Sequence, residues 1–356
     1  FDKARMTPKD MAVAESEISG AFQNITPEFV STLKMVINNV STFYRKQIKK
    51  PCCVKSEDGI MLKEEYKPID TVGVYIPAGT APLVSSVYMT VIPAQIAGVK
   101  RIVMVTPPCR DGQINPYILA VANLLNVKEI YKIGGSQAVA ALAFGTKTVP
   151  KVDKIVGPGN AYVTEAKRQL FGYVDIDMLA GPTELVLIAN RHTNPDYVVA
   201  DFESQLEHAG GLSILISTSK QLIKQVRNRV QGGYVIYAKN MTEACDIANR
   251  IAPEHLQIMT SDPQSVAKMI RHAGAIFLGP YSPTPLGDYI AGPSHVLPTL
   301  GTARFSSGLS LSDFMKTSHL IAYSRKALEK VHGPLQRIAM IEGLVKHAES
   351  VNVRFK

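Results

Sequence analysis

The fold of this chain is constrained most by a regular alternation of apolar strands and helical segments that starts at Thr71. Strands are predicted at 71–76, 101–106, 128–133 and 154–156, with helices at 85–98, 116–125 and 137–144 between them. Short connections in such an alternation are typical of a parallel, doubly wound sheet. The carboxyl ends of its strands share one edge, where ligands bind. Tyr75, Gln137 and Asn160 lie at or just past such ends.

The alternation resumes after a buried-type strand at 184–189. Helices are predicted at 194–208, 219–230, 242–251 and 266–272, and strands at 212–217, 234–237, 256–260 and 275–278. No exact sequence repeat relates the two halves, so only their design is similar. The predicted fold class is α/β, with two Rossmann-like doubly wound parallel-sheet domains, N-terminal helices and a small C-terminal helical domain.

Four domains are predicted from these patterns. Residues 1–73 form an N-terminal helical segment that leads into the first α/β domain, with helices at 8–22 and 27–49 and a hairpin turn at Asp58-Gly59. Residues 74–182 and 183–312 form the two Rossmann-like domains, and Ser282–Ser312 is expected to be a long ordered loop. Residues 313–356 form the C-terminal helical domain, with a helix at 334–350.

Two glycine turns flank one helix between residues 154 and 190. Gly157–Gly159 follows a short strand, Asn160 is a good N-cap for a helix at 161–170, and Gly181-Pro182 precedes the next buried strand. Such turns let backbone N–H groups approach a ligand, and a helix N-terminus favours an anionic one. The alternative is two ordinary connections of an α/β protein.

Composition limits the class of protein and its partners. Hydrophobic residues make up 46% of the 356, with no apolar run of the roughly 18 residues that a membrane span needs and no signal peptide at the start. The net charge of +9 indicates a solvated basic surface or a partner such as a phosphate-bearing small molecule. A nucleic-acid partner is not expected, because aromatic residues do not interleave with the basic ones as a nucleic-acid platform requires. Four cysteines without a CxxC pair indicate neither disulfides nor a thiolate zinc site, and they suit the cytoplasm. A GxGxxG dinucleotide fingerprint with its downstream acidic residue is absent from the sequence.

Two polar pairs in the second half are candidates for metal binding and proton transfer. Gln205 and His208 are three residues apart on a predicted helix, which puts two metal ligands on one face; the alternative is a surface helix end. Glu254-His255 follows a proline and precedes a strand. A buried Glu and His at this place would act as two different acid–base groups, unless they are a chance polar pair in a connection.

Two further pairs lie nearer the C-terminus. Asp288 and His295 occur in the glycine-rich loop, where an Asp oxygen would complement the imidazole ligands of a zinc-like ion, unless both make ordinary loop hydrogen bonds. Glu342 and His347 are five residues apart on the predicted last helix and would point about 140° apart. One could therefore contact a substrate while the other binds metal; the alternative is a solvated helical face.

Eight segments of the chain resemble blocks of histidinol dehydrogenase, in the order of that family. They are VGVYIPAGTAPL, KIGGSQAVAALAFGT, VPKVDKIVGPGNAYVTEAKRQL, DIDMLAGPTE, SQLEH, RIAPEHL, GDYIAGPSHVLPT and EGLVKHA. The resemblance covers nearly the whole chain. It implies a four-electron oxidation of L-histidinol through L-histidinal to L-histidine, the last two steps of histidine synthesis, with two NAD reduced.

The resemblance also implies a role for each candidate residue. One Zn²⁺ per subunit would be held by Gln205, His208, Asp288 and His347, which would also touch substrate. Glu254 and His255 would be the catalytic proton-transfer residues. NAD would contact Tyr75, Gln137 and Asn160 in the first Rossmann-like domain. Substrate would further contact Thr183, His255, His295 and Glu342.

The family's intertwined homodimer implies active sites shared across subunits, with Glu342 and His347 reaching the site of the other subunit. Neither a nucleic acid nor a membrane is an expected partner, and the expected localisation is cytoplasmic. Three departures from the family are visible. The segment before Gly232 is shorter than usual, the family's opening residues are absent, and Thr183 stands where Ser is common, which keeps the hydroxyl.

Two other functions compete with this interpretation. A relative on the same scaffold could oxidise another small alcohol such as a sulfonated propanediol, although the anionic Glu342 suits a cationic substrate better. A non-catalytic binding protein on an old enzyme scaffold is the other alternative. The complete Glu254-His255 pair and the complete metal set speak against it.

Overall fold

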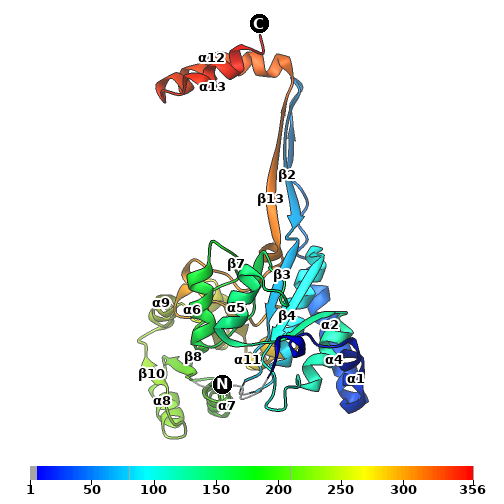
Figure 1. The fold of residues 1–356 in the computed structure, drawn as a ribbon. Helices are drawn as coiled ribbons and strands as arrows, with labels where there is room; N and C mark the ends of the chain where they lie inside the picture. Colours follow the sequence, from blue (N-terminus) through cyan, green and yellow to red (C-terminus); the bar gives the residue numbers. More distant parts are fainter. Residues whose placement is uncertain (1–5, 80, 209, 356) are drawn as a thin grey trace. The chain divides into compact units, whose positions relative to one another are not determined.

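The computed structural model describes residues 6–79, 81–208 and 210–355, and the chain forms two compact units (Figure 1). The first unit comprises residues 1–47 and 69–314, and the second comprises residues 48–68 and 315–356. Within the described residues, no helix is both long and apolar enough to cross a membrane.

Five parallel strands form the first sheet of the first unit, in the order β5-β4-β3-β6-β7. They are β3 (Thr71–Tyr75), β4 (Arg101–Thr106), β5 (Glu129–Lys132), β6 (Lys154–Val156) and β7 (Asp175–Ile176). The chain builds outward from β3 to β5 and then returns to the other side of β3. The strand order therefore reverses between β3 and β6, and ligands of doubly wound sheets bind at the carboxyl edge of such a switch point.

A second parallel sheet of the first unit repeats this topology. Its order is β10-β9-β8-β11-β12, which matches the first sheet strand for strand, so its switch point lies between β8 and β11. The strands are β8 (Glu184–Ala189), β9 (Leu212–Ser217), β10 (Tyr234–Tyr237), β11 (His255–Met259) and β12 (Ala275–Leu278). The predicted fold class is confirmed, and the similar design seen in the sequence is a repeated strand order.

Helices connect the strands and cover the sheets (Figure 1). In the first half they are α3 (Val84–Ala97), α4 (Pro116–Leu124), α5 (Gly135–Phe144) and α6 (Ala161–Leu170). In the second half they are α7 (Pro195–Leu206), α8 (Lys220–Arg227), α9 (Met241–Ile251) and α10 (Pro263–Ala267). The first sheet is preceded by η1 (Pro8–Asp10), α1 (Glu15–Gly20), η2 (Ala21–Asn24) and α2 (Pro27–Arg45).

Strand β8 shows how the sequence sets this packing. Its residues are all buried. Val186 and Ile188 pack into a cluster with residues of α9, whereas Leu185 and Leu187 pack into a cluster with residues of α7 and α8. A parallel strand covered on both faces needs apolar side chains on both faces, which explains a continuous apolar run instead of an alternating one.

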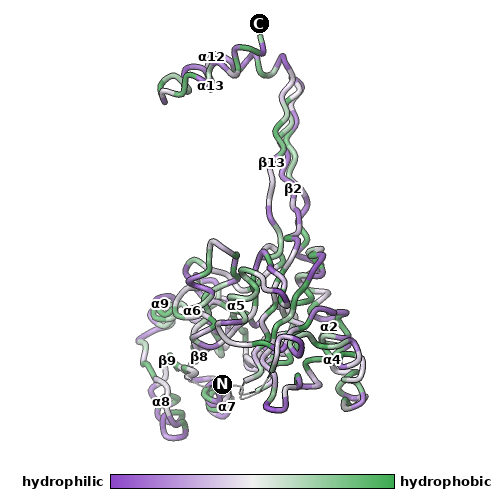
Figure 2. The backbone as a smooth tube through the Cα atoms, viewed as in Figure 1, coloured by the Kyte–Doolittle hydropathy of each residue, from purple (hydrophilic) through white to green (hydrophobic). Residues whose placement is uncertain are grey.

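The second unit is an antiparallel sheet followed by two helices. Strands β1 (Cys53–Lys55) and β2 (Ile60–Pro68) form the hairpin predicted at Asp58-Gly59, and β13 (Met315–Tyr323) pairs with β2 along its whole length. Helices α12 (Arg325–Ile341) and α13 (Val345–Asn352) follow. Hydrophilic and hydrophobic residues both occur along β2 and β13 in Figure 2.

Several sequence-based expectations are wrong in detail. The single helix expected at 334–350 is two helices, separated at Gly343, whose φ is +73°. Glu342 is the C-cap of α12 and His347 lies in α13, so the angle argued for one helix does not apply. Strand β13 was not expected, because its pairing partner β2 is distant in the sequence.

The glycine-rich segment 282–312 is also more structured than expected. It contains helix α11 (Thr284–Tyr289) and the short 3-10 helix η3 (Thr302–Arg304), and a second 3-10 helix, η4 (Leu311–Phe314), begins at its end. Asp288 therefore lies on a helix, and His295 lies in the loop that follows it.

Candidate active site

Glu254 and His255 lie where strand β11 begins, beside the switch point of the second sheet. His255 is the first residue of β11 and pairs with Leu185 of β8. Both side chains are buried, since Glu254 is 7% and His255 is 3% exposed. The pair thus occupies the amino edge of this sheet, which agrees with its predicted place just before a strand.

Three side chains form one hydrogen-bonded chain at this edge. Gln205, in the last turn of α7, donates its Nε2 to Thr183 Oγ1 at 2.6 Å. Thr183 donates its hydroxyl to Glu254 Oε2 at 2.5 Å, and the same oxygen accepts the N–H of Glu184 at 2.9 Å. A hydroxyl that accepts from an amide is oriented to donate onward, so each bond fixes the next. The Gln205 amide oxygen is then the atom that can face a ligand.

His255 lies between two carboxylates. Its Nδ1 is 3.3 Å from the carbonyl oxygen of Glu184 and 3.4 Å from Glu254 Oε2, and its Nε2 is 3.5 Å from Asp288 Oδ1. Burial by itself favours the neutral imidazole, but Asp288 and Glu254 outweigh it and raise the pKa of His255 to about 10. A buried imidazole in contact with two carboxylates is suited to proton transfer.

Asp288 is surrounded by imidazoles. Burial opposes its ionisation, but the hydrogen bond and charge of His255 outweigh burial and lower the pKa of Asp288 below its ordinary value. The carboxylate is therefore charged and available as an oxygen ligand. His208 does not share a helix with Gln205 as expected: α7 ends at Leu206, and His208 lies exposed in the turn that follows.

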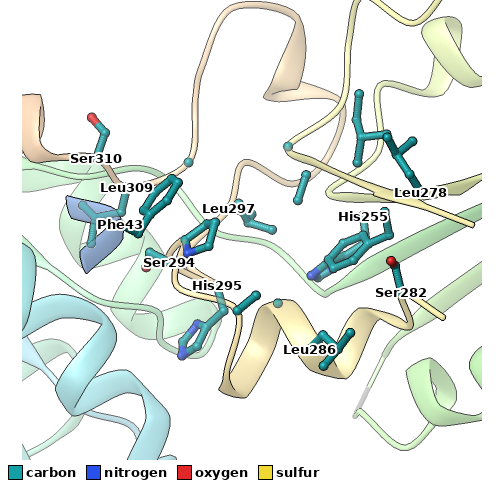
Figure 3. Close-up of a pocket in the computed structure, with 18 of the residues that line it drawn as sticks. Phe43, His255, Leu278, Ser282, Leu286, Ser294, His295, Leu297, Leu309 and Ser310 are labelled. Carbon is teal, nitrogen blue, oxygen red and sulfur yellow. The ribbon is translucent and has the colours of Figure 1, made fainter. Parts of the chain in front are cut away.

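A cavity of about 580 Å³ opens beside His255 and His295 (Figure 3). Its other walls are mostly apolar and include β12, Leu286 of α11, Phe43 of α2 and parts of the loops at 291–297 and 308–310. The Nε2 atoms of His255 and His295 are both buried, and neither has a hydrogen-bond partner among the described residues. Because buried polar atoms are normally hydrogen-bonded, these two nitrogens indicate a ligand-binding cavity. Burial lowers the pKa of His295, which keeps it neutral.

The remaining predicted ligands lie in the second unit. Glu342 ends α12, and His347 is in α13. Over the described parts of the chain, no three His, Cys, Asp or Glu side chains form a group that could hold a metal ion. The predicted metal ligands differ from such a group, because one of them is the amide of Gln205 and another is a histidine of the second unit.

The three residues predicted to contact NAD gather at the carboxyl edge of the first sheet. Tyr75 ends β3, and its hydroxyl accepts the N–H of Gly135 at 3.0 Å. Gln137, two residues further on in α5, folds its side chain over Gly135. Asn160 caps α6 and accepts the N–H groups of Tyr162 and Val163, each at 3.1 Å. Tyr75 and Asn160 thus flank the switch point between β3 and β6.

A buried ion pair fixes the turn that follows β6. Lys167 of α6 donates its Nζ to Asp177 Oδ1 and to the carbonyl oxygen of Gly157, both at 2.6 Å. Asp177 Oδ2 accepts the N–H of Gly157, also at 2.6 Å. Both backbone polar groups of Gly157 are thereby bound by one ion pair. A Cβ at Gly157 would collide with the carbonyl oxygen of Tyr75, so the two strand ends at the switch point meet closely.

The sequence interpretation missed some of these residues. Glu184 is buried, its Oε1 accepts the N–H of Leu300 at 2.9 Å, and burial raises its pKa. An acidic residue that opens an apolar strand was the available signal. Lys167 and Asp177 gave no signal, because a lysine on an amphipathic helix resembles a surface charge.

These features define the class of protein: an α/β enzyme built from two Rossmann-like sheets, with a buried acid–base pair at the edge of one sheet. The fold has a counterpart among solved structures. A putative aldehyde dehydrogenase from Burkholderia cenocepacia superposes with a TM-score of 0.53 at 12% identity, covering 87% of this chain and 83% of its own, which is a likeness of fold alone.

The family follows from closer relatives. The histidinol dehydrogenase family model matches residues 1–355. The histidinol dehydrogenase of Clostridium acetobutylicum is 46% identical over 375 residues, which cover 100% of this chain and 86% of the relative. The crystal structure of histidinol dehydrogenase from Elizabethkingia anophelis superposes with a TM-score of 0.95 at 37% identity, covering 100% of this chain and 86% of that one. The chain belongs to the histidinol dehydrogenase family and is thus an oxidoreductase.

Proposed function

We propose that this enzyme oxidises L-histidinol through L-histidinal to L-histidine, with two NAD reduced and one zinc ion per subunit. Family membership carries the proposal, because the relatives that match the full chain are named histidinol dehydrogenase. The buried Glu254-His255 pair beside Asp288 supports it, because both oxidation steps require proton transfer.

The residues of the amino-edge site fit a zinc ion. Gln205 has its amide nitrogen bonded to Thr183, which leaves its oxygen as a donor, and Asp288 is an ionised carboxylate near His208. Oxygen and imidazole donors suit zinc. The proposed ligands are Gln205, His208, Asp288 and His347. Bound zinc would supply a Lewis acid that anchors and polarises the substrate.

His255 is the proposed base for the alcohol proton. Its Nε2 faces Asp288 and has no hydrogen-bond partner among the described residues. It can therefore accept the proton of a substrate hydroxyl while the carbon that bears this hydroxyl transfers a hydride to the nicotinamide. Before the second oxidation, water adds to the aldehyde, and Glu254 is the proposed base for that water. The hydrate then loses a hydride to a second NAD and its hydroxyl proton to His255. A carboxylate that binds a dication loses much of its effect on a neighbouring imidazole, so Asp288 would not keep His255 protonated in the loaded enzyme.

Substrate binding is proposed to involve Thr183, His295 and Glu342 besides the zinc ligands and His255. A neutral, buried His295 with a free Nε2 can bind an uncharged polar group of the substrate. Glu342 suits the ammonium group of histidinol. The same charge argues against the sulfonated alternative substrate.

NAD is proposed to bind at the switch point of the first sheet, through Tyr75, Gln137 and Asn160. The position supports the proposal, because dinucleotides bind at the carboxyl edge where the strand order reverses. The ion pair of Lys167 and Asp177 holds the Gly157 turn there.

A homodimer with shared sites is the proposed assembly. Large apolar side chains of the second unit are exposed, with Ile321 at 72% and Ile341 at 86%. Further exposed apolar side chains lie close to these two in the sequence, at 320–323 and 338–345, and runs of this kind are typical of an interaction site. In the proposed dimer, His347 and Glu342 of one subunit complete the site of the other. The cytoplasm is the proposed location.

The decisive experiment is the stoichiometry of NADH formed from L-histidinol, before and after removal of metal with a chelator. Two NADH per histidinol, lost on chelation and restored by zinc, are expected. One NADH per histidinol would reject the second oxidation. If the folded, zinc-loaded protein forms no NADH, histidinol is not its substrate. A sulfonated propanediol would then be assayed.

A further inference from the structure

Helices α2 and α3 hold the segment that carries Asp288 and His295. Tyr88 of α3 donates its hydroxyl to the carbonyl oxygen of Tyr289 at 3.0 Å, directly after Asp288. Asn39 of α2 donates its Nδ2 to the next carbonyl, that of Ile290, at 3.1 Å. The backbone beside Asp288 is therefore bonded to both helices.

The backbone beside His295 is held by one phenol. Tyr44 of α2 accepts the N–H of Ser294 at 3.1 Å and donates to the carbonyl oxygen of Leu309 at 2.8 Å. It thus joins the two ends of the loop that contains His295. Tyr44 is 0% exposed, and burial raises its pKa to about 12, which keeps the phenol as a donor.

The segment has few means of fixing its own position. Helix α11 has only six residues and no side-chain cap, and glycines lie on both sides of Asp288. Gly287 packs against the ring of Phe277, while Gly292 packs beside Phe43 and the carbonyl of Asn39. A short, glycine-rich segment of this kind depends on its neighbours for an exact geometry, and a 1 Å error at a catalytic site is costly.

We propose that Tyr88 and Tyr44 are positioning residues of the active site, with Tyr88 setting Asp288 for the metal and Tyr44 setting His295 for the substrate. The inference rests on the proposed function, which assigns zinc to Asp288 and substrate to His295. Neither phenol contacts the reacting atoms; each acts through the backbone that it holds.

The test compares Tyr88→Phe and Tyr44→Phe with the wild type in two measurements. Zinc affinity is measured by competition with a chromophoric chelator, and KM for L-histidinol is measured with saturating zinc. Tyr88→Phe is expected to weaken zinc binding about tenfold, which is the usual effect of removing an outer partner of a metal ligand. Tyr44→Phe is expected to raise KM for histidinol several-fold while zinc affinity changes less than twofold.

Thr90→Val is the matched control. Thr90 lies on the same helix as Tyr88, is fully buried, and bonds through its hydroxyl to the carbonyl of Ser86 at 2.6 Å, so the variant also loses a buried hydroxyl bond. It is expected to change thermal stability but neither zinc affinity nor KM. If Tyr44→Phe does not fold, the inference is decided on its Asp288 half, where Asn39→Ala is expected to weaken zinc binding in the manner of Tyr88→Phe.

The outcomes separate the inference from the proposed function. A wild type that binds no zinc and leaves histidinol unoxidised rejects the proposed function. A wild type that does both, with Tyr88→Phe and Tyr44→Phe changing only the melting temperature as Thr90→Val does, overturns the inference.

Discussion

Thr183 links the proposed metal site to the proposed acid–base pair through one hydroxyl. It accepts from Gln205 and donates to Glu254, so its single oxygen orients both side chains. A hydrogen bond to a charged group contributes about 1.5–3 kcal/mol. The effect of losing this hydroxyl should therefore extend to both halves of the site.

The variant Thr183→Val removes the hydroxyl and keeps the shape. We expect kcat/KM for histidinol to fall on the order of 10–100-fold, and zinc affinity to fall with it, because Gln205 and Glu254 each lose a partner. Steady-state kinetics and a chelator titration measure the two effects. Thr183→Ser should restore both, and a valine variant with wild-type kinetics would show that the hydroxyl orients neither group.

Glu184 gives a pH prediction for stability. Burial raises its pKa in the folded protein, so the ionised carboxylate is less favourable there than in the unfolded chain. At a pH below the pKa of Glu184 in the unfolded chain, the side chain is protonated in both states and does not lower the stability. At a pH above its pKa in the folded protein, the side chain is ionised in both states and the loss of stability is complete. We expect Glu184→Gln to melt at a higher temperature than wild type at pH 8, with the difference shrinking as the pH falls toward about 4. A constant difference across this range would contradict the argument.

At the scale of elements, the turn between β6 and α6 shows why glycine is needed. Gly157 has a φ of +112° and no room for a Cβ, whereas Gly172, with a φ of +101°, has open space around it. Alanine at either position bears the strain of a left-handed backbone, but only at 157 does it also displace Tyr75.

Gly157→Ala and Gly172→Ala therefore form a matched pair. We expect Gly172→Ala to cost about 1–2 kcal/mol of stability and to leave NAD binding unchanged. Gly157→Ala should cost more and weaken NAD binding, because the ends of β3 and β6 are forced apart. Thermal unfolding and titration of NAD by fluorescence quenching test the pair. Equal NAD affinity in the two variants would show that NAD does not bind at the switch point between β3 and β6.

At the scale of the whole molecule, shared active sites predict complementation between inactive chains. A dimer of one Glu254→Gln chain and one His347→Ala chain would have one site with both changes and one with neither. Random pairing of equal amounts would restore about a quarter of wild-type activity, because half of the dimers are mixed and each has one intact site. The restored activity is measured with an NADH assay after the two chains, each with its own tag, are co-expressed. Mixed dimers without activity would place Glu254 and His347 of the same chain in one site.

The sequence determined the local elements and the order in which they alternate. Strands β4, β8 and β12 have the bounds that the sequence predicted. In β8 the buried run after Glu184 is apolar on both faces, because helices cover both faces of that strand. The Glu254-His255 pair could be selected from the sequence, because ionisable residues next to a buried strand are rarely buried unless they are paired or functional.

Only the tertiary structure decided which residues meet. It joined Thr183, Gln205 and Glu254 by hydrogen bonds at an amino edge and placed His255 between Glu254 and Asp288. It also paired β2 with β13. It also made four side chains partners of backbone atoms in other elements or turns, namely Tyr44, Tyr88, Lys167 and Asp177. Local patterns record which face of an element is apolar, whereas contacts between distant residues depend on how the elements pack, and no single segment contains that information.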